Sequence, residues 1–537
     1  MKNFGKSNFI LFLLLTAVGL YGQSVLPTLP ASEPYEVPSK TIAFTNWYFV
    51  RPGHFDWIDS TGASVYTKKV NLKELDAVFV PLDIPMGVEL FTEKAKREIP
   101  IIKTDKPWDN WGIKPSTLIL ENGTYRLWGT CNSNFQDEYN CYFESKDGIN
   151  WIKPELNLVE FNGSKKNNLF KKDIGISIFI DPSAPASERY KTISHGKISS
   201  EEFSKYKNSR PWSVYATELD PPDVHVMRGA VSPDGLNWKT LEDPLGFEHF
   251  DTQNIGYYDQ SLKKYVFYVR GFMIGPRAPG YSYPTEKFHQ YIMRRSVSRI
   301  ESEQFGNLPL SEIILETTPY MDPTEQFYTN CYTTIPNSPD HHLMFPSMYK
   351  ISNDETTISL YSSYNGKTWH KLPGSPIYST QNFGEPDGGT VFAQPNLVER
   401  PDGDWILPYT AYNVPHKYPR GAYRFETGLL VWPKGRLSGI EAKGEGEFAT
   451  IAFVVPGTTI KINALTHRTG YIKVEVVGMD GNPVEGYSFE DSIPIIGDYH
   501  KENVIWKNNK ELGVAKGKPV FLRFKMRMAK IYQLYFN

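Results

Sequence analysis

The sequence contains little cysteine and has no bias in charge. Its 537 residues include three Cys, and 58 Lys and Arg stand against 60 Asp and Glu, for a formal net charge of -2 at pH 7. No long basic or acidic run occurs, so the chain lacks the electrostatic footprint of a nucleic-acid-binding protein. The spacing of the Cys residues is wrong for a zinc site. A neutral, hydrogen-bonding substrate fits this composition better than a charged one.

Long apolar runs are missing except near the N-terminus. Residues 9–20 form an apolar stretch behind Lys2 and Lys6, shorter than the roughly 20 residues that a membrane-spanning helix needs. Charged, apolar and then small residues in this order are typical of a signal peptide, with cleavage expected near Gly22 or Gln23. No Cys lies there to carry a lipid, which leaves an uncleaved anchor as the alternative. The sequence predicts a periplasmic or secreted product without membrane contact after cleavage.

Helical periodicity is scarce. From residue 40 onward, short β-branched and aromatic runs alternate with Gly, Pro, Asn and Asp, which is typical of all-β proteins. Aromatic residues make up 14% of the chain, which suits both a β-rich core and platforms for stacking sugars. Cys131 and Cys141 flank an expected hairpin, either as an export-compartment disulfide or as two buried thiols, and Cys331 is left over.

An internal repeat is the most informative feature. The form S-x-[DN]-G-x-x-W begins at Ser145, Ser232 and Ser363, each time after a strand-like run. The Asp-Gly or Asn-Gly pair supplies the positive φ angles of a tight turn, over which the Trp packs. The interval from Ser232 to Ser363 is long enough for two units, so a unit without the signature is expected around residues 293–298. One four-stranded sheet per unit indicates a β-propeller.

Five expected opening strands support this architecture. They cover residues 111–120, 175–180, 252–258, 328–335 and 390–398, and the second strands of the same units cover 124–129, 189–194, 264–270, 342–349 and 405–412. After residue 436, strands at 459–464, 471–477, 520–526 and 529–536 indicate a separate antiparallel sandwich. We therefore expect an all-β chain with a five-bladed β-propeller and a C-terminal β-sandwich. The predicted divisions are a signal peptide at 1–23, an extension packing on the propeller at 24–102, the propeller at 103–435 and the sandwich at 436–537.

The chain resembles the five-bladed β-propeller glycoside hydrolases of families 43, 32 and 117, in which a C-terminal β-sandwich often follows the propeller. The resemblance rests on Pro107-Trp108-Asp109-Asn110-Trp111 ahead of Tyr125-Arg126-Leu127-Trp128, on the Asp-Gly turns, and on the sandwich stretch 481–491. It implies cleavage of glycosidic bonds in poly- or oligosaccharides by carboxylates at the channel-facing ends of innermost strands. No invertase-type Asn-Asp-Pro-Asn-Gly box occurs.

Hydrolysis of a glycosidic bond needs one carboxylic acid to protonate the leaving oxygen and a second carboxylate as base or nucleophile. The openings of the first, third and fifth blades contain Asp109, Asp251 and Glu385, which we take as the candidate catalytic residues. A strand cap or an ordinary turn is the structural alternative for each. The candidate substrate-binding residues are Trp108, Trp111, His195, His249, Gln253, Arg270, Asn330, Asp387 and Gln394. No metal ligand and no required cofactor are expected, although the resemblance allows a structural Ca²⁺.

Three other functions remain open at this stage. A sialidase has a similar propeller, but its turn has one more residue between Asp and Gly, and its arginine cluster cannot be placed. A polysaccharide lyase would use a Tyr and His pair with arginines. A sugar-binding propeller without turnover would keep the aromatic platforms but would not need carboxylates at three blade openings.

Overall fold

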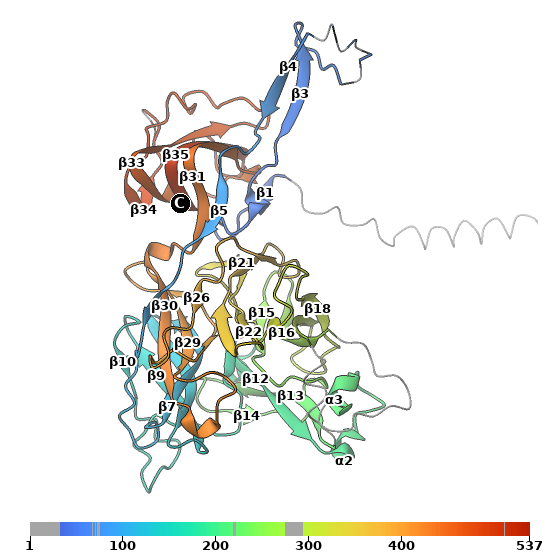
Figure 1. Ribbon diagram of the computed structural model, residues 1–537, viewed down its shortest axis with the longest axis vertical. Helices are drawn as coiled ribbons and strands as arrows, with labels where there is room; N and C mark the ends of the chain where they lie inside the picture. Colours follow the sequence, from blue (N-terminus) through green and yellow to red (C-terminus); the bar gives the residue numbers. More distant parts are fainter. Residues whose placement is uncertain are drawn as a thin grey trace, which may run out of the picture.

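The computed structural model describes residues 33–537, apart from 67, 70, 72, 74, 75, 219–221, 274–293, 508 and 510. The expected signal peptide lies outside the described residues. Figure 1 shows two lobes, with the hairpin of β3 (His54–Asp59) and β4 (Ala77–Leu82) projecting from the upper one. Strands dominate both lobes, and α2 (Ser200–Phe203) and α3 (Val214–Glu218) are the α-helices of the described part. None of the helices described is both long and apolar enough to cross a membrane.

The first three groups of strands in the lower lobe are antiparallel and follow chain order. The first strand of each group begins close to a predicted opening strand, because the sequence contains both the alternation of apolar residues and the turn residues that flank the strand. The first group is β7 (Gly112–Glu121), β8 (Thr124–Asn132), β9 (Glu138–Ser145) and β10 (Trp151–Ile152). The second is β11 (Ser177–Ile180), β12 (Tyr190–Ile198), β13 (Val224–Ser232) and β14 (Lys239–Thr240). The third is β15 (Ile255–Asp259), β16 (Lys264–Phe272), β17 (Arg295–Ser302) and β18 (Glu312–Leu315).

The next group of strands is interrupted halfway along. One small sheet contains β20 (Tyr332–Ile335), β21 (Ser338–Met344), β24 (Tyr361–Ser363) and β25 (His370–Lys371). A second contains β19 (Glu325–Phe327), β22 (Ser347–Lys350), β23 (Glu355–Ile358) and β26 (Tyr378–Ser379). Cys331 has a φ of 42° and Pro346 has no N–H to donate, so the first two strands of this group break where unbroken strands were expected.

The last group connects the two ends of the lower lobe. It contains β27 (Thr390–Ala393), β28 (Val398–Glu399), β29 (Trp405–Tyr412) and β30 (Phe425–Trp432). Its outer edge is completed by β6 (Lys96–Glu98), which pairs with β30. Phe425 of β30 also pairs with Gly112 of β7, so the last group joins the first in one sheet.

The repeated turn has the local chemistry that the sequence predicts. Ser145 Oγ accepts the N–H of Gly148 at 2.9 Å, and Asp147 Oδ1 accepts the N–H of Asn150 at 2.7 Å. The glycine φ is 71°, and the copies that begin at Ser232 and Ser363 make the same hydrogen bonds. In those two copies the Trp indole N–H donates to the Gly carbonyl of its own turn.

The unit without the signature is the third group of strands. Residues 295–298, near which its turn was expected, lie within β17, and the turn follows that strand. Ser302 Oγ accepts the N–H of Gln304 at 3.2 Å, and the buried Leu308 occupies the position that Trp holds in the other copies. The serine and the buried apolar residue are kept, but the Asp-Gly pair is lost.

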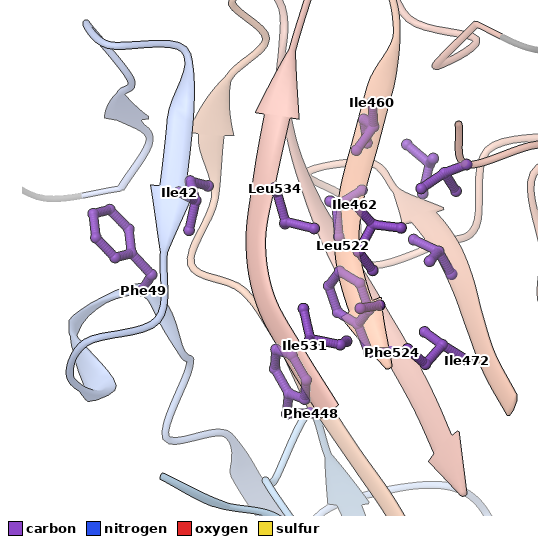
Figure 2. Close-up of a cluster of buried hydrophobic side chains, with 14 of the residues drawn as sticks. Ile42, Phe49, Phe448, Ile460, Ile462, Ile472, Leu522, Phe524, Ile531 and Leu534 are labelled. Carbon is purple, nitrogen blue, oxygen red and sulfur yellow. The ribbon is translucent and has the colours of Figure 1, made fainter. Parts of the chain in front are cut away.

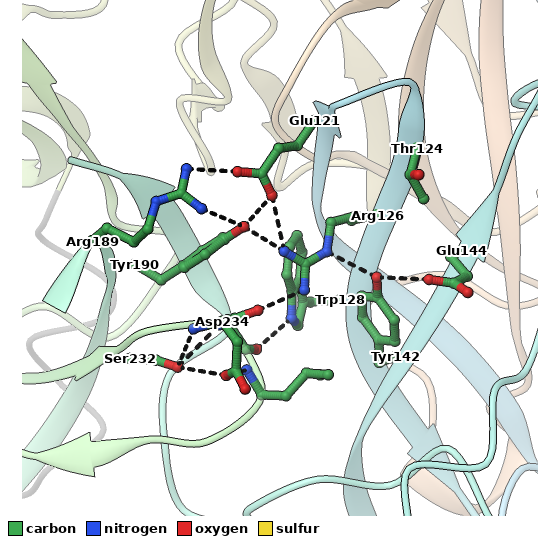
Figure 3. Close-up of polar contacts among 12 residues, drawn as sticks. Glu121, Thr124, Arg126, Trp128, Tyr142, Glu144, Arg189, Tyr190, Ser232 and Asp234 are labelled. Carbon is green, nitrogen blue, oxygen red and sulfur yellow. Dashed lines mark hydrogen bonds and ion pairs between the residues drawn. The ribbon is translucent and has the colours of Figure 1, made fainter. Parts of the chain in front are cut away.

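Each signature turn is held by side chains of the preceding group of strands. Figure 3 shows Arg126 reaching the carbonyl of Asp234 (2.6 Å), while Trp128 donates to the carbonyl of Gly235 (2.8 Å). Arg299 donates to the carbonyl of Gly366 at 2.7 Å in the same way. The turn of one group of strands is thus hydrogen-bonded to the group that precedes it.

The upper lobe is built around one long strand. β35 (Pro519–Phe536) pairs with β31 (Ser438–Ala449), β32 (Phe453–Val454) and β33 (Ile460–Val477), and β33 also pairs with β34 (Asp498–Asn503). The sequence predicted two strands in place of β35 and two in place of β33. Register shifts allow both strands to continue through a bend, and Met528 has a φ of 42°. Figure 2 shows the apolar core between these strands, including Phe448, Ile462, Leu522 and Phe524.

The N-terminal segment was expected to pack on the propeller, but three of its six described strands pair with the upper lobe, while β3 and β4 pair with each other. β1 (Tyr35–Glu36) pairs with β32, β2 (Thr41–Ala43) with β35 and β5 (Glu89–Thr92) with β31. Only β6 pairs with the lower lobe. Cys131 and Cys141 form a disulfide between β8 and β9, and Cys331 is a buried free thiol.

Candidate functional site

A polar cavity of about 310 Å³ lies where the first strands of several sheets meet. Its lining comes from β7, β8, β9, β11, β12, the residues just before β15 and those just after β27, so chain segments far apart in sequence share it. The lining residues with polar side chains are Ser116, Thr130, Glu138, Asn140, Ser177, Ser194, His195, Thr252, Gln253, Asn254 and Gln394. Hydroxyl, amide and imidazole groups of this kind suit a ligand rich in hydroxyl groups.

Three of the predicted binding residues line this cavity: His195, Gln253 and Gln394. Gln253 Nε2 donates to Gln394 Oε1 at 3.0 Å, and Gln253 Oε1 accepts the N–H of Cys331 at 2.7 Å. Asn330 is buried and donates to the carbonyl of Gln253 at 3.1 Å. Asn330 therefore orients the backbone of a lining residue and is not itself part of the lining.

Asp251 directly precedes the lining residue Thr252, and its side chain is 34% exposed. Its Oδ1 accepts a hydrogen bond from Arg270 at 2.5 Å, while a second guanidinium nitrogen of Arg270 donates to the carbonyl of Tyr328 at 2.9 Å. Burial opposes ionisation of Asp251, but the charges of Arg270 and Arg295 and the hydrogen bond from Arg270 outweigh it and lower the pKa of the carboxyl. Asp251 is thus an ionised carboxylate next in sequence to the cavity lining.

Three imidazoles cluster beside Asp251. His195 Nε2 and His225 Nδ1 lie 2.8 Å apart, and the ring centroids of His225 and His249 are separated by 4.1 Å. His249 Nδ1 lies 3.4 Å from Asp251 Oδ1. Burial lowers the pKa of His249 to about 3, so this ring is neutral at pH 7. The sequence analysis found His195 and His249 but not His225, which lies inside β13 with no motif around it.

Glu138 is the carboxylate in the cavity lining that the sequence analysis missed. It opens β9 and forms an ion pair with Lys114 of β7. The side chain is 46% exposed, so substrate can reach it. Catalytic carboxylates were expected only at the openings of innermost strands, whereas Glu138 opens β9, the third strand of its group.

Asp109 does not line the cavity. Its side chain is fully buried, where Lys153 Nζ lies 2.5 Å from Oδ2 and the N–H of Lys106 donates to Oδ1 at 2.9 Å. Burial raises the pKa of Asp109 despite these partners. The neighbouring Trp108 donates to Asn168 Oδ1 at 2.9 Å. These contacts anchor the entry to β7 and give Asp109 and Trp108 structural roles.

Trp111 also lies outside the cavity lining. The guanidinium of Arg424 sits 3.3 Å from the centroid of its ring. Because Arg424 covers that face of the indole, the stacking position expected for a sugar on this face is already occupied.

Glu385 and Asp387 lie together, away from the residues that line the cavity. Both pair with Arg97 of β6, and the guanidinium of Arg97 lies 2.5 Å from Asp387 Oδ1. The Asp387 side chain is fully buried and also accepts hydrogen bonds from the hydroxyls of Tyr378 and Tyr409. These carboxylates hold the N-terminal strand β6 against the lower lobe.

The carboxylates at the cavity do not fit the Ca²⁺ site that the resemblance allows. Glu138 is paired with Lys114 and Asp251 with Arg270, so neither presents uncompensated negative charge to a cation. Among the residues that the structure describes, no group of three His, Cys, Asp or Glu is arranged to hold a metal ion.

No family model and no curated protein sequence matches this chain. Among solved structures, it is similar to a glycoside hydrolase with a TM-score of 0.38 and 10% identity, covering 63% of this chain and 92% of that one. An N-acetylgalactosamine deacetylase from F. plautii, in complex with blood group B trisaccharide, has a TM-score of 0.37 and 11% identity over 64% and 95%. An exo-inulinase from Aspergillus awamori has a TM-score of 0.33 and 10% identity over 81% and 99%. The glycoside hydrolase and the exo-inulinase are of the kind that the sequence resembles. These superpositions are partial, so the function of this chain has to be inferred from its own residues.

Proposed function

We propose that this chain is a glycoside hydrolase that cleaves glycosidic bonds of poly- or oligosaccharides in the polar cavity. The observation that carries the proposal is a pair of partly exposed carboxylates from different groups of strands: Glu138 lines the cavity, and Asp251 directly precedes the lining residue Thr252. Asp251 is the base or nucleophile, because Arg270 keeps it ionised. Glu138 is the acid, and the ammonium of Lys114 has to withdraw from it before Glu138 can hold a proton.

The rest of the cavity suits a neutral carbohydrate. Gln253, Gln394 and His195 offer donors and acceptors to sugar hydroxyls, and the chain has a net charge of only -2. No required cofactor enters this reaction. Nucleic acid and membrane are not among the proposed partners.

We propose a five-bladed β-propeller with a C-terminal β-sandwich as the architecture that presents this site. The five groups of strands in the lower lobe would be the blades, and the pairing of β30 with β7 supports a closed ring. Export to the periplasm or the medium is proposed from the N-terminal apolar run and supported by the Cys131–Cys141 disulfide, because such bonds persist in oxidising compartments.

Release of reducing sugar from a panel of plant and algal oligosaccharides by the mature protein tests the proposed reaction. Asp251→Asn and Glu138→Gln should each lower kcat by about 10²- to 10⁴-fold, the range for loss of a general acid or base. Glu385→Gln is the matched control, since this carboxylate lies outside the cavity lining and pairs with Arg97. Equal losses in the control and the two site variants would contradict the assignment.

A sugar-binding propeller without turnover is the second candidate. The pairing of both cavity carboxylates with cations favours it, since ion-paired carboxylates can orient hydroxyls without transferring protons. Oligosaccharide binding measured by calorimetry with no product from any member of the panel would select this candidate over the hydrolase.

A further inference from the structure

Several side chains that line the polar cavity have fixed hydrogen-bonding roles, because they contact backbone groups. A backbone carbonyl can only accept a hydrogen bond, so a side-chain group that is bonded to one must donate. Asn254 Nδ2 donates to the carbonyl of Phe250 at 3.0 Å and to that of Thr252 at 2.9 Å. Both N–H groups of this amide are therefore used, and Oδ1 is the polar side-chain atom that remains.

Asn254 Oδ1 is a buried acceptor in a residue of the cavity lining. Asn254 is only 4% exposed, and among the described residues none donates a hydrogen bond to its Oδ1. A buried acceptor without a donor is costly, and a ligand that donates to it removes that cost. Asn254 therefore favours a ligand that places a hydrogen-bond donor beside Oδ1.

Asn140 of β9 repeats this arrangement. It is buried, lines the cavity, and donates from Nδ2 to the carbonyls of Lys171 at 2.8 Å and Ile174 at 3.3 Å. Its Oδ1 receives no hydrogen bond from the part of the chain that the structure describes. Two buried amides of the lining thus keep only their oxygen atoms for a ligand.

Hydroxyl groups of the same lining have the same bias. Ser116 Oγ donates to the carbonyl of Ile176 at 2.9 Å, and Ser177 Oγ donates to the carbonyl of Asn254. A hydroxyl group has one hydrogen, so each of these two groups keeps only lone pairs for a ligand. This part of the lining therefore consists of acceptors.

Gln394 adds a donor to the lining. The N–H of Cys331 donates to Gln253 Oε1 at 2.7 Å, and Gln253 Nε2 donates to the carbonyl of Ala393 at 2.9 Å. These backbone groups fix the orientation of the Gln253 amide, so the Gln394 atom 3.0 Å from Gln253 Nε2 must be the acceptor Oε1. Gln394 Nε2 then has Thr410 Oγ1 at 3.4 Å as its partner and keeps a second N–H for a ligand.

Sugar hydroxyl groups fit this pattern better than an ammonium group does. Glu138 is already paired with Lys114, and the charge of Asp251 is compensated by Arg270. An ammonium group would therefore meet no uncompensated negative charge. A free hydroxyl group can donate to an acceptor and can also accept from Gln394, whereas the oxygen of an O-methyl or O-acetyl group can only accept.

We infer that Asn254 determines the specificity of the hydrolase proposed above: its Oδ1 accepts the hydrogen of one sugar hydroxyl, and Asn140 Oδ1 accepts that of another. This specificity rests on the proposed function, because the sugar is the substrate. The cavity takes sugar residues whose hydroxyl groups are free at these two places and rejects those that carry O-methyl or O-acetyl groups there. Each blocked hydroxyl should weaken binding about 10- to 100-fold, because a buried acceptor then loses its donor.

Binding of simple glycosides tests this specificity without depending on turnover. The probes are the methyl pyranosides of glucose, galactose and mannose and their mono-O-methyl derivatives, titrated against the mature protein by ligand-observed NMR. For the glycoside that the parent binds most tightly, O-methylation at one position should weaken binding about 10- to 100-fold. In Asn254→Ala the same O-methyl group should cost less than about threefold, because the acceptor that it leaves unpaired has been removed.

Two further variants complete the experiment. Asn140→Ala should relieve the cost of O-methylation at a different hydroxyl, and it serves as the test where Asn254→Ala does not fold. Asn463→Ala is the matched control and should keep the O-methyl pattern of the parent. This buried amide of the upper lobe accepts from Arg436 at 3.0 Å and donates to the carbonyl of Lys434 at 2.7 Å.

An equal cost of O-methylation in the parent and in Asn254→Ala would overturn the role of Asn254. A parent that binds none of the glycosides would overturn it as well. The expected binding pattern without release of reducing sugar from any oligosaccharide would contradict the proposed hydrolysis, but it would support the role of Asn254 in binding.

Discussion

Arg400 donates two hydrogen bonds, at 3.2 and 2.9 Å, to the carbonyl oxygen of Gly148, 252 residues earlier in the chain. This contact fastens the turn of the first group of strands to the last group, as Arg299 of the third group fastens the Gly366 turn of the fourth. The same guanidinium is bidentate to Glu98 of β6. One buried arginine therefore joins the first strands, the last strands and the N-terminal segment.

Arg400→Ala should destabilise the protein by about 3 kcal/mol, because it leaves a carbonyl and a carboxylate without their charged partner. Urea denaturation followed by tryptophan fluorescence would measure the loss. The exposed Arg468, changed to Ala, is the control and should cost less than about 0.5 kcal/mol. Equal midpoints for the two variants would show that the ring closes without this contact.

Arg270→Met should move the acid limb of kcat/KM to higher pH. In the parent, the lowered pKa of Asp251 keeps the carboxyl ionised as the pH falls. The contribution of this carboxylate to kcat/KM is therefore lost only at a pH below its ordinary pKa of about 4. Removing the guanidinium takes away the largest cause that lowers the pKa of Asp251, so burial should dominate and the pKa should rise. A pH profile of reducing-sugar release checks this, with Arg468→Met as control. An unmoved acid limb would exclude Asp251 as the group that sets it.

Asp387→Asn and Glu385→Gln should differ in stability although both residues pair with Arg97. Asp387 is fully buried with two tyrosine hydroxyls as further partners, so its loss should cost about 3 kcal/mol. Glu385 is one-third exposed, so its ion pair is screened by solvent and its loss should lower the unfolding midpoint much less. Thermal unfolding monitored by circular dichroism would compare them. Activity lost in either variant while its unfolding midpoint is unchanged would contradict a purely structural role.

His249 should make the folded state less stable in mild acid. Its pKa of about 3 in the fold lies below the ordinary value of about 6.5, so the unfolded chain binds the additional proton between these values. The free energy of unfolding should therefore fall as the pH decreases below about 6.5, with a slope from this group approaching about 1.4 kcal/mol per pH unit.

Denaturant titrations at pH 7, 6 and 5 on the parent and on His249→Phe would isolate that slope as the difference between the two proteins. The exposed His370, changed to Phe, serves as the control and should leave the slope of the parent unchanged. A variant with the same slope as the parent would mean that His249 is already charged in the folded protein.

Local sequence was sufficient for the parts of this protein that depend on neighbouring residues. The Ser-x-Asp-Gly turns at Ser145 and Ser232 form as predicted, because the serine, the aspartate and the positive φ of the glycine act within four residues. The opening strands were found near their true bounds for the same reason. Asp251 was found because it lies just ahead of the opening strand β15, in a polar stretch that supplies three lining residues of the cavity.

Tertiary structure decided the rest, because the decisive partners are distant in the chain. From local sequence, Glu385 and Asp387 resemble catalytic carboxylates at a blade opening. In the fold both pair with Arg97, which lies 288 and 290 residues away in the chain. From local sequence, Glu138 resembles an ordinary surface residue. In the fold, β9 places it in the cavity that Gln253 and Gln394 also line. The sequence by itself determined the turns, most of the strands and the polar character of the site. Which carboxylates lie near that site depended on tertiary contacts, because Arg97 holds Glu385 and Asp387 against β6 while β9 places Glu138 in the cavity lining, and the partners in each case are distant in the chain.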